Sequence, residues 1–213
     1  MANRGCYLLL LLLALASDAK SVFAQAAALQ VQVYDYTGLS PVAIHEFIAR
    51  TQEILTGAGI SVEVDACPRG VSTPCEGRRG SFRQVVIRVI AGAPRKNKEA
   101  RWQHLGQSIA THDGGTYASV FLKPAEEKAS DANLPRIIVL AYAAAHEVGH
   151  LLLGDEAHTP QGLMKADWET DDFRAMAQSR FHFSPEQTRE LKRRYGAGRS
   201  AAVGADTSIA ARH

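Results

Sequence analysis

The stretch Arg136–Leu153 reads RIIVLAYAAAHEVGHLLL, a long run of apolar residues interrupted by two histidines and one glutamate. Eighteen residues make about five turns of α-helix. Pro135 precedes the run, and Gly154 follows it directly. Glycine is the residue that most often stands just past the end of a helix. We therefore expect a buried helix over these residues that ends at Gly154.

His146 and His150 are four residues apart within this expected helix. Helical residues at that spacing lie on one face, so both imidazoles can reach one ion. Neutral imidazole is a good ligand for Zn²⁺. Glu147 would stand beside the metal and take a proton from a water that the metal activates. Without a metal, these buried polar groups would need other partners to offset the loss of hydration.

A catalytic zinc ion needs a third protein ligand and one open position. The chain must turn after Gly154 before another side chain can face the metal. His158 matches the ligand type and follows the glycine by four residues, so it is the favoured third ligand. The carboxylates downstream stay open as alternatives: Asp155, Glu156, Asp167 and Glu169.

The segment from His146 to His158, HEVGHLLLGDEAH, followed by Gly162-Leu163-Met164, resembles the metzincin zinc peptidases. That family has two helical histidines, a catalytic glutamate, a glycine turn, a third histidine and a methionine-containing turn beneath the metal. The family places two residues on each side of the glycine between histidines, and this chain has three on each side. The resemblance implies these roles: zinc ligands His146, His150 and His158, general base Glu147, and Met-turn residue Met164.

The rest of the chain predicts one α+β domain over residues 25–195. Alternating apolar and polar residues predict strands, and the expected strands are 29–34, 60–64, 82–90, 105–110 and 116–122, with a turn at 112–115. Proline in a first helical turn predicts helices that begin after Ser40 and after Ser184. This order of elements also matches the family, which implies a zincin-like fold with a small twisted mixed sheet packed on helices.

The N-terminus predicts a secretory signal peptide over residues 1–24. Arg4 is followed by an apolar run of ten residues, 7–16, and Ala24 ends a Val-Phe-Ala cleavage site. A membrane-spanning helix needs about 20 apolar residues, so a membrane anchor is the less favoured alternative. We expect a secreted or periplasmic protein, with no membrane contact after cleavage. The small and polar segment 196–213 is expected to be a disordered tail.

Cysteine usage agrees with export. Cys6 would leave with the signal peptide, and Cys67 and Cys75 would remain. An even number of cysteines in an oxidising compartment favours a disulfide. Two free or metal-binding thiols are the alternative interpretation.

Composition excludes several classes of protein. With 46% apolar and 22% charged residues, the chain of 213 residues is typical of a globular protein rather than of a disordered one. The net charge is +2 and no basic cluster stands out, so we expect no nucleic-acid binding. We expect a monomer that acts on a peptide or protein substrate.

The function predicted is hydrolysis of peptide bonds, and the alternative is a secreted zinc-binding interaction module without catalysis. An extended substrate would lie along an edge strand, either 105–110 or 116–122. Three aromatic residues could approach the site but are expected to pack or to lie at the surface: His112, Tyr117 and Trp168. Four histidines lack ligand spacing and are read as ordinary surface or core residues: His45, His104, His182 and His213.

Overall fold

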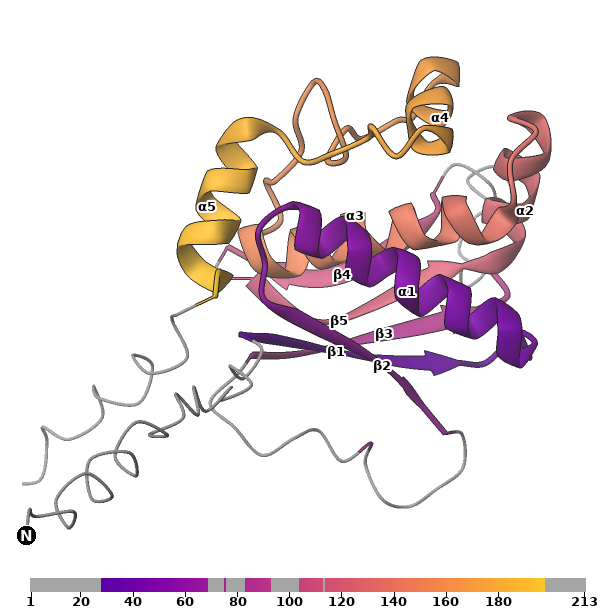
Figure 1. Ribbon diagram of the computed structural model, residues 1–213, viewed down its shortest axis with the longest axis horizontal. Helices are drawn as coiled ribbons and strands as arrows, with labels where there is room; N and C mark the ends of the chain where they lie inside the picture. The colour runs from indigo at the N-terminus through magenta and orange to yellow at the C-terminus, as the bar shows by residue number, and fades with distance from the viewer. Residues whose placement is uncertain (1–27, 69–74, 76–82, 93–103, 113, 198–213) are drawn as a thin grey trace, which may run out of the picture.

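The fold is α+β, as the sequence predicts, with one mixed five-stranded sheet in the order β2-β1-β3-β5-β4. The computed structural model describes residues 28–68, 75, 83–92, 104–112 and 114–197 (Figure 1). The strands are β1 (Leu29–Asp35), β2 (Val62–Cys67), β3 (Arg83–Ile90), β4 (Gly106–Thr111) and β5 (Gly114–Phe121). The helices are α1 (Pro41–Gly57), α2 (Leu122–Asp131), α3 (Arg136–Leu153), α4 (Thr170–Ala177) and α5 (Pro185–Tyr195).

The pairing of strands places β4 at an edge of the sheet. β1 runs parallel to both β2 and β3, and β3 runs parallel to β5. β4 pairs antiparallel with β5, with an irregularity in register between Ile109 and Ala110. Of the two strands that could bind an extended substrate, 105–110 is thus the edge strand, whereas 116–122 lies inside the sheet.

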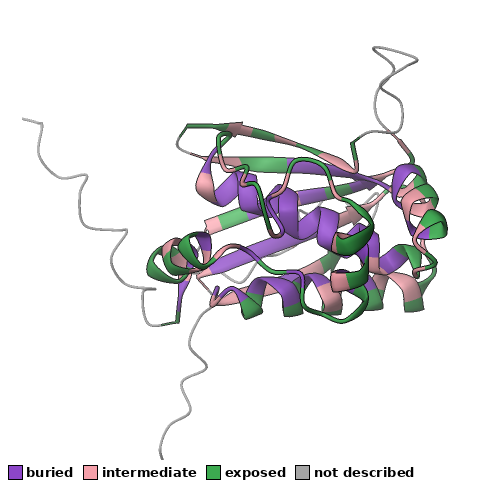
Figure 2. Cartoon of the chain, turned by 90° about the horizontal axis from the view of Figure 1, so that it is seen from above, coloured by how far each residue is buried: buried purple, intermediate pink, exposed green. Residues whose placement is uncertain are grey.

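The core lies between the sheet and the two long helices α1 and α3 (Figures 1 and 2). Alternate residues of β1 and β3 face these helices and are fully buried: Leu29, Val31, Val33, Val85, Ile87 and Val89. Among the described helices, α3 is the one long and apolar enough to cross a membrane. Because 83% of it is buried inside the protein, α3 is the central helix of the core.

Local caps explain why two of the helices begin where the sequence predicts. The Ser40 hydroxyl accepts a hydrogen bond from the backbone N–H of Ala43, and Pro41 is the first residue of α1. At α5, the Ser184 hydroxyl accepts from the Gln187 N–H, and the Gln187 side chain accepts from the Ser184 N–H. Such reciprocal caps satisfy backbone donors that a helix end leaves free.

Two short helices, α2 and α4, were not predicted. α2 has Pro124 in its first turn and buries mainly Ala125 and Ala129, so its apolar stripe is weak. α4 has eight residues and buries Phe173 and Met176. Helices this short depend on tertiary packing more than on their own sequence. Leu122, expected at the end of a strand, is instead the first residue of α2.

Two predicted boundaries differ from the structure. The strand expected at 60–64 begins at Val62, because the Ile60 N–H bonds to the Leu55 carbonyl at the end of α1. In the turn expected at 112–115, Gly114 and Gly115 belong to β5. The predicted signal peptide 1–24 lies outside the described residues, as does the part of the predicted tail beyond residue 197.

Cys67 and Cys75 form a disulfide bond. Cys67 is the last residue of β2, the strand at the edge opposite to β4. The Gln32 side chain on β1 donates a hydrogen bond of 3.0 Å to the Cys75 carbonyl. The bridge therefore ties residue 75 back onto the far side of the sheet from β4.

Candidate metal centre

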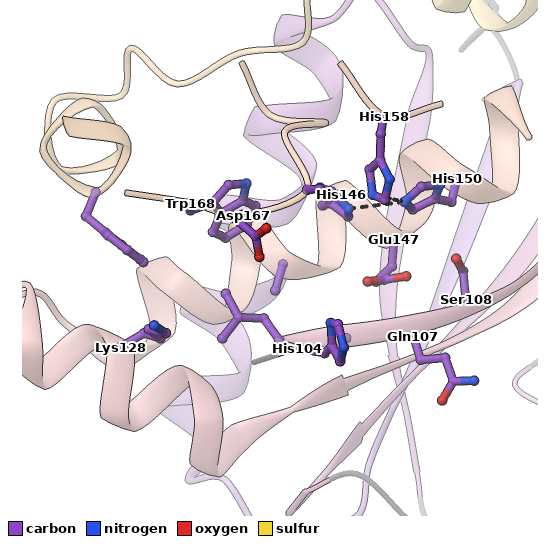
Figure 3. Close-up of a pocket in the computed structure, with 15 residues that line it drawn as sticks. His104, Gln107, Ser108, Lys128, His146, Glu147, His150, His158, Asp167 and Trp168 are labelled. Carbon is purple, nitrogen blue, oxygen red and sulfur yellow. Dashed lines mark hydrogen bonds between the residues drawn. The ribbon is translucent and has the colours of Figure 1, made fainter. Parts of the chain in front are cut away.

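Three imidazoles meet at one point above α3 (Figure 3). His146 and His150 are 9% and 7% exposed, and His158, from the segment after α3, is exposed. The His150 Nε2 atom lies 3.1 Å from the Nε2 atoms of both His146 and His158. Zinc–nitrogen bonds of about 2.1 Å at tetrahedral angles separate two ligand nitrogens by about 3.4 Å. The spacing of the three rings therefore suits one metal ion.

Backbone carbonyls determine which ring nitrogen carries the proton. The Nδ1 atom of His146 lies 2.8 Å from the Leu163 carbonyl, and that of His150 lies 3.3 Å from the Gly154 carbonyl. A carbonyl accepts only, so Nδ1 must donate, which leaves Nε2 of each neutral ring with a bare lone pair. Two bare lone pairs at 3.1 Å repel each other unless a cation lies between them. These ring nitrogens therefore suit a metal ion such as zinc. The two backbone carbonyls supply the hydrogen bonds that usually orient metal-binding imidazoles.

Burial keeps the helical histidines neutral. Loss of solvation lowers the pKa of His146 to about 4, against a smaller opposing effect of the Leu163 hydrogen bond. Burial also lowers the pKa of His150. Neutral imidazole is the form that binds a metal. At neutral pH both rings are thus ready to act as ligands without first losing a proton.

Gly154 turns the chain back toward the metal centre. Its φ is +105°, a backbone conformation that residues other than glycine rarely adopt. A Cβ atom there would also lie 2.9 Å from the His112 carbonyl oxygen. The turn accommodates the longer spacing on both sides of Gly154, brings His158 to the site and places the Gly154 carbonyl beside His150.

The segment that contains Leu163 and Met164 packs against α3. Met164 is fully buried, and a Cβ atom added to Gly149 would lie 2.4 Å from its sulfur. Met164 therefore fills the notch that Gly149 leaves on the ligand helix. The neighbouring Leu163 carbonyl accepts from His146, and the Leu163 N–H donates to the His182 carbonyl.

Helix α5 braces the segment that carries His158. The buried Gln187 side chain donates a hydrogen bond of 2.8 Å to the carbonyl of Ala157, the residue before His158. The same side chain caps α5 by accepting from the Ser184 N–H. One amide thus connects the start of α5 to the third histidine.

Glu147 points from α3 toward β4, beneath the three rings (Figure 3). Its side chain is 7% exposed. Burial raises the pKa of Glu147 to about 7, although a hydrogen bond from the Ser108 side chain lowers it. A carboxyl group with a pKa near neutrality is well suited to accept and return a proton.

The site opens into a cleft of about 340 Å³ between β4 and the segment 166–168. Beyond the histidines, the far end of the cleft is lined by His104, Lys128, Asp167 and Trp168 (Figure 3). The Trp168 ring stands edge-on to His146 at 5.7 Å between ring centres, and its N–H donates to the Leu163 carbonyl. An open position beside the metal centre therefore faces a space that can hold a ligand.

Most of the residues singled out in the sequence come together here. His146, His150 and His158 form one ligand group, and none of the four alternative carboxylates among the described residues joins it. Asp167 lines the cleft without reaching the group. Tyr117 is on β5, 52% exposed, and does not line the cleft.

Several residues at the site carry no sequence signal that we recognised. His104, which lacks ligand spacing in the sequence, is an exposed residue, and it lines the cleft together with Ser108 and Lys128. A pattern of side chains cannot indicate that the backbone carbonyls of Gly154 and Leu163 lie at the site. Gly149 did offer a hint, since glycine inside a helix costs about 1 kcal/mol and so often marks a close contact.

No protein-family model matches the chain, and no curated protein sequence matches it. Among solved structures, an archaemetzincin from Methanopyrus kandleri has 16% identity and a TM-score of 0.46, over 78% of this chain and 94% of that one. Metalloproteinase-II from Bacteroides fragilis has 13% identity and a TM-score of 0.46, over 80% of this chain and 54% of that one.

Proposed function

We propose that this chain is a zinc-dependent peptidase in which Glu147 is the general base. The observation that carries the proposal is the convergence of three Nε2 atoms beside a buried carboxylate in an open cleft. His146, His150 and His158 would hold the ion. A bound zinc ion supplies a Lewis acid that polarises a carbonyl and makes water acidic near pH 7.

The other roles in the reaction belong to residues of the chain itself. Glu147 accepts a proton from the attacking water at a carboxylate oxygen and returns it to the leaving amine. The carbonyls of Leu163 and Gly154 keep two imidazoles oriented with Nε2 toward the centre. The edge strand β4 has one side free of strand partners among the described residues. An extended peptide can add to that side through backbone hydrogen bonds.

The alternative is a zinc-binding module that does not catalyse. A structural zinc site is normally closed by a fourth protein ligand. Among the described residues, three histidines form the group, and the space beside them is a cleft. These features favour a catalytic site over a structural one.

We also propose where the protein acts and which class of substrate it cleaves. The predicted signal peptide 1–24 and the disulfide between Cys67 and Cys75 both favour a secreted or periplasmic protein. The substrate proposed is a peptide or protein, met by a monomer without nucleic-acid or membrane partners.

The test combines metal analysis with a cleavage assay on the purified protein. We expect one zinc ion per chain and cleavage of a mixed peptide library that a chelator abolishes. Glu147→Gln should keep its zinc and lose about 10²- to 10⁴-fold in kcat/KM. Glu156→Gln, at an exposed carboxylate of the nearby turn, is the control and should remain active. Full activity of Glu147→Gln, or zinc binding without any cleavage, would contradict the proposal.

A further inference from the structure

The carboxylate of Glu147 lies directly against the backbone of β4. A Cβ atom added to Gly106 would lie 2.6 Å from both Cγ and Oε1 of Glu147. Real Cβ atoms essentially never approach other atoms so closely. A residue larger than glycine at position 106 would therefore displace the Glu147 side chain.

Ser108, two residues further along β4, lines the same pocket as Glu147, and its side chain lowers the pKa of that carboxyl group. Residues two apart on a strand face the same side of the sheet, so Gly106 and Ser108 both face α3. Their partners on β5, Val120 and Ala118, are buried on that side. Figure 3 shows Ser108 beneath Glu147, on the opposite wall from the three histidines. The serine hydroxyl donates, because an ionised carboxylate can only accept.

The terminal torsion of glutamate does not by itself fix the orientation of the carboxylate. This torsion is broad and roughly two-fold, unlike the staggered torsions nearer the backbone. Contacts therefore decide which way the two oxygens point. With Glu147 7% exposed, the Ser108 hydroxyl replaces part of the hydration that burial removes.

We propose that Ser108 is a positioning residue, which orients the general base through its hydroxyl while Gly106 leaves room for the carboxylate. The inference rests on the proposed peptidase function of Glu147. A general base must lie within hydrogen-bond distance of the proton that it takes. A carboxylate free to rotate spends less time in that position, so kcat should fall while metal binding stays intact.

The test uses matched serine variants and two independent measurements. Ser108→Ala should lower kcat about tenfold, with KM and zinc content close to wild type. Ser108→Thr keeps the hydroxyl and should restore kcat. Ser130→Ala, at an exposed serine on α2, is the control. In crystal structures, the Glu147 carboxylate should take one orientation in wild type and Ser108→Thr, and more than one in Ser108→Ala.

Gly106→Ala tests the other half of the inference. It should move the Glu147 carboxylate in a crystal structure and lower kcat while zinc is retained. Two results would overturn the inference. One is a Ser108→Ala protein with wild-type kcat and a single carboxylate orientation, and the other is a loss of zinc or thermal stability that accounts for the lost activity.

The crystallographic measurement also separates this inference from the proposed function. If wild type and Glu147→Gln hydrolyse peptides equally, the general-base assignment is wrong. The orientation of Glu147 in Ser108→Ala then still decides whether Ser108 holds the carboxylate.

Discussion

At the scale of single residues, His158 differs from the two helical histidines in how it reaches the candidate metal centre. The spacing of His146 and His150 is a property of α3 itself, whereas His158 comes from the irregular segment after the Gly154 turn. Its Nε2 atom nevertheless lies 3.1 Å from that of His150. The exposed third ring is therefore the part of the ligand group that depends most on the turn.

Replacing His158 tests the third ligand directly. We expect His158→Ala to weaken zinc binding by more than about 100-fold, the upper range for loss of a group that only supports a ligand. The alternative carboxylate Asp155, exposed in the turn, provides the control variant Asp155→Ala. Competition with a chelating dye measures both affinities. Equal zinc affinity in wild type and His158→Ala would assign the third ligand to another residue.

The raised pKa of Glu147 gives the zinc-free protein a specific pH dependence. Above pH 7 the folded protein buries a carboxylate that the unfolded chain exposes, and this lowers stability. Below pH 4.5 the carboxyl group is protonated in both states, so the effect vanishes. Zinc-free Glu147→Gln should therefore be more stable than zinc-free wild type by up to about 3 kcal/mol at pH 8, and equally stable at pH 4.

Urea unfolding of both proteins at the two pH values measures this difference. Glu46→Gln, at an exposed position on α1, is the matched control and should show no such pH dependence. A stability difference of the same size at pH 4 and pH 8 would show that the variant acts through packing rather than through charge.

At the scale of elements, the C-terminal end of α3 is held by hydrogen bonds from elsewhere in the chain. The Arg83 guanidinium on β3 donates to the carbonyls of Leu151 and Gly115, each at 2.8 Å, and to the Tyr195 hydroxyl at 3.0 Å. Charged donors at a helix C-terminus satisfy carbonyls that lack a partner within the helix. This single side chain ties β3, β5, α3 and α5 together next to the Gly154 turn.

Helix α5 should matter to metal binding although it contributes no ligand. Gln187→Leu removes the donor to the Ala157 carbonyl, so the segment with His158 loses its brace. We expect zinc affinity to fall about tenfold and the free energy of unfolding to fall by about 1 to 2 kcal/mol. Arg189→Ala, at an exposed position on the same helix, should change neither. Unchanged zinc affinity in Gln187→Leu would show that the segment holds its shape without α5.

At the scale of the whole molecule, the candidate metal centre and the disulfide lie at opposite edges of the sheet. β4 forms one edge, next to Glu147, and β2 with Cys67 forms the other. The strands between them, β1, β3 and β5, pair in regular parallel register. Stability and metal binding should therefore respond separately to changes at the two edges.

Removing the disulfide should affect stability alone. The bridge closes a loop with a sequence separation of 8, and the double variant Cys67→Ser with Cys75→Ser should lose about 2 to 3 kcal/mol of unfolding free energy. Zinc affinity should stay at the wild-type value. Denaturant unfolding and zinc titration check the two statements, with reduced wild type as a second route to the same state. Loss of zinc in the variant would show that the two edges are coupled.

Features that depend on neighbouring residues could be predicted from the sequence, whereas features that depend on distant segments of the chain could not. The caps at Ser40 and Ser184 and the end of α3 at Leu153 were predictable, because each depends on a few neighbouring residues. α2 was missed because its stability comes from small side chains packed on α3. The place of His104 in the cleft depends on where β4 pairs, and no pattern of neighbouring residues indicates that.

The sequence by itself determined the chemistry of α3. The spacing of His146, Glu147 and His150 sets their faces on any helix, and the composition of the run requires that helix to be buried. The tertiary structure alone decided how those groups are held: the Leu163 and Gly154 carbonyls behind the rings, and Gly106 and Ser108 against Glu147. The physical reason is that helical spacing is local, whereas these contacts join segments that only packing brings together.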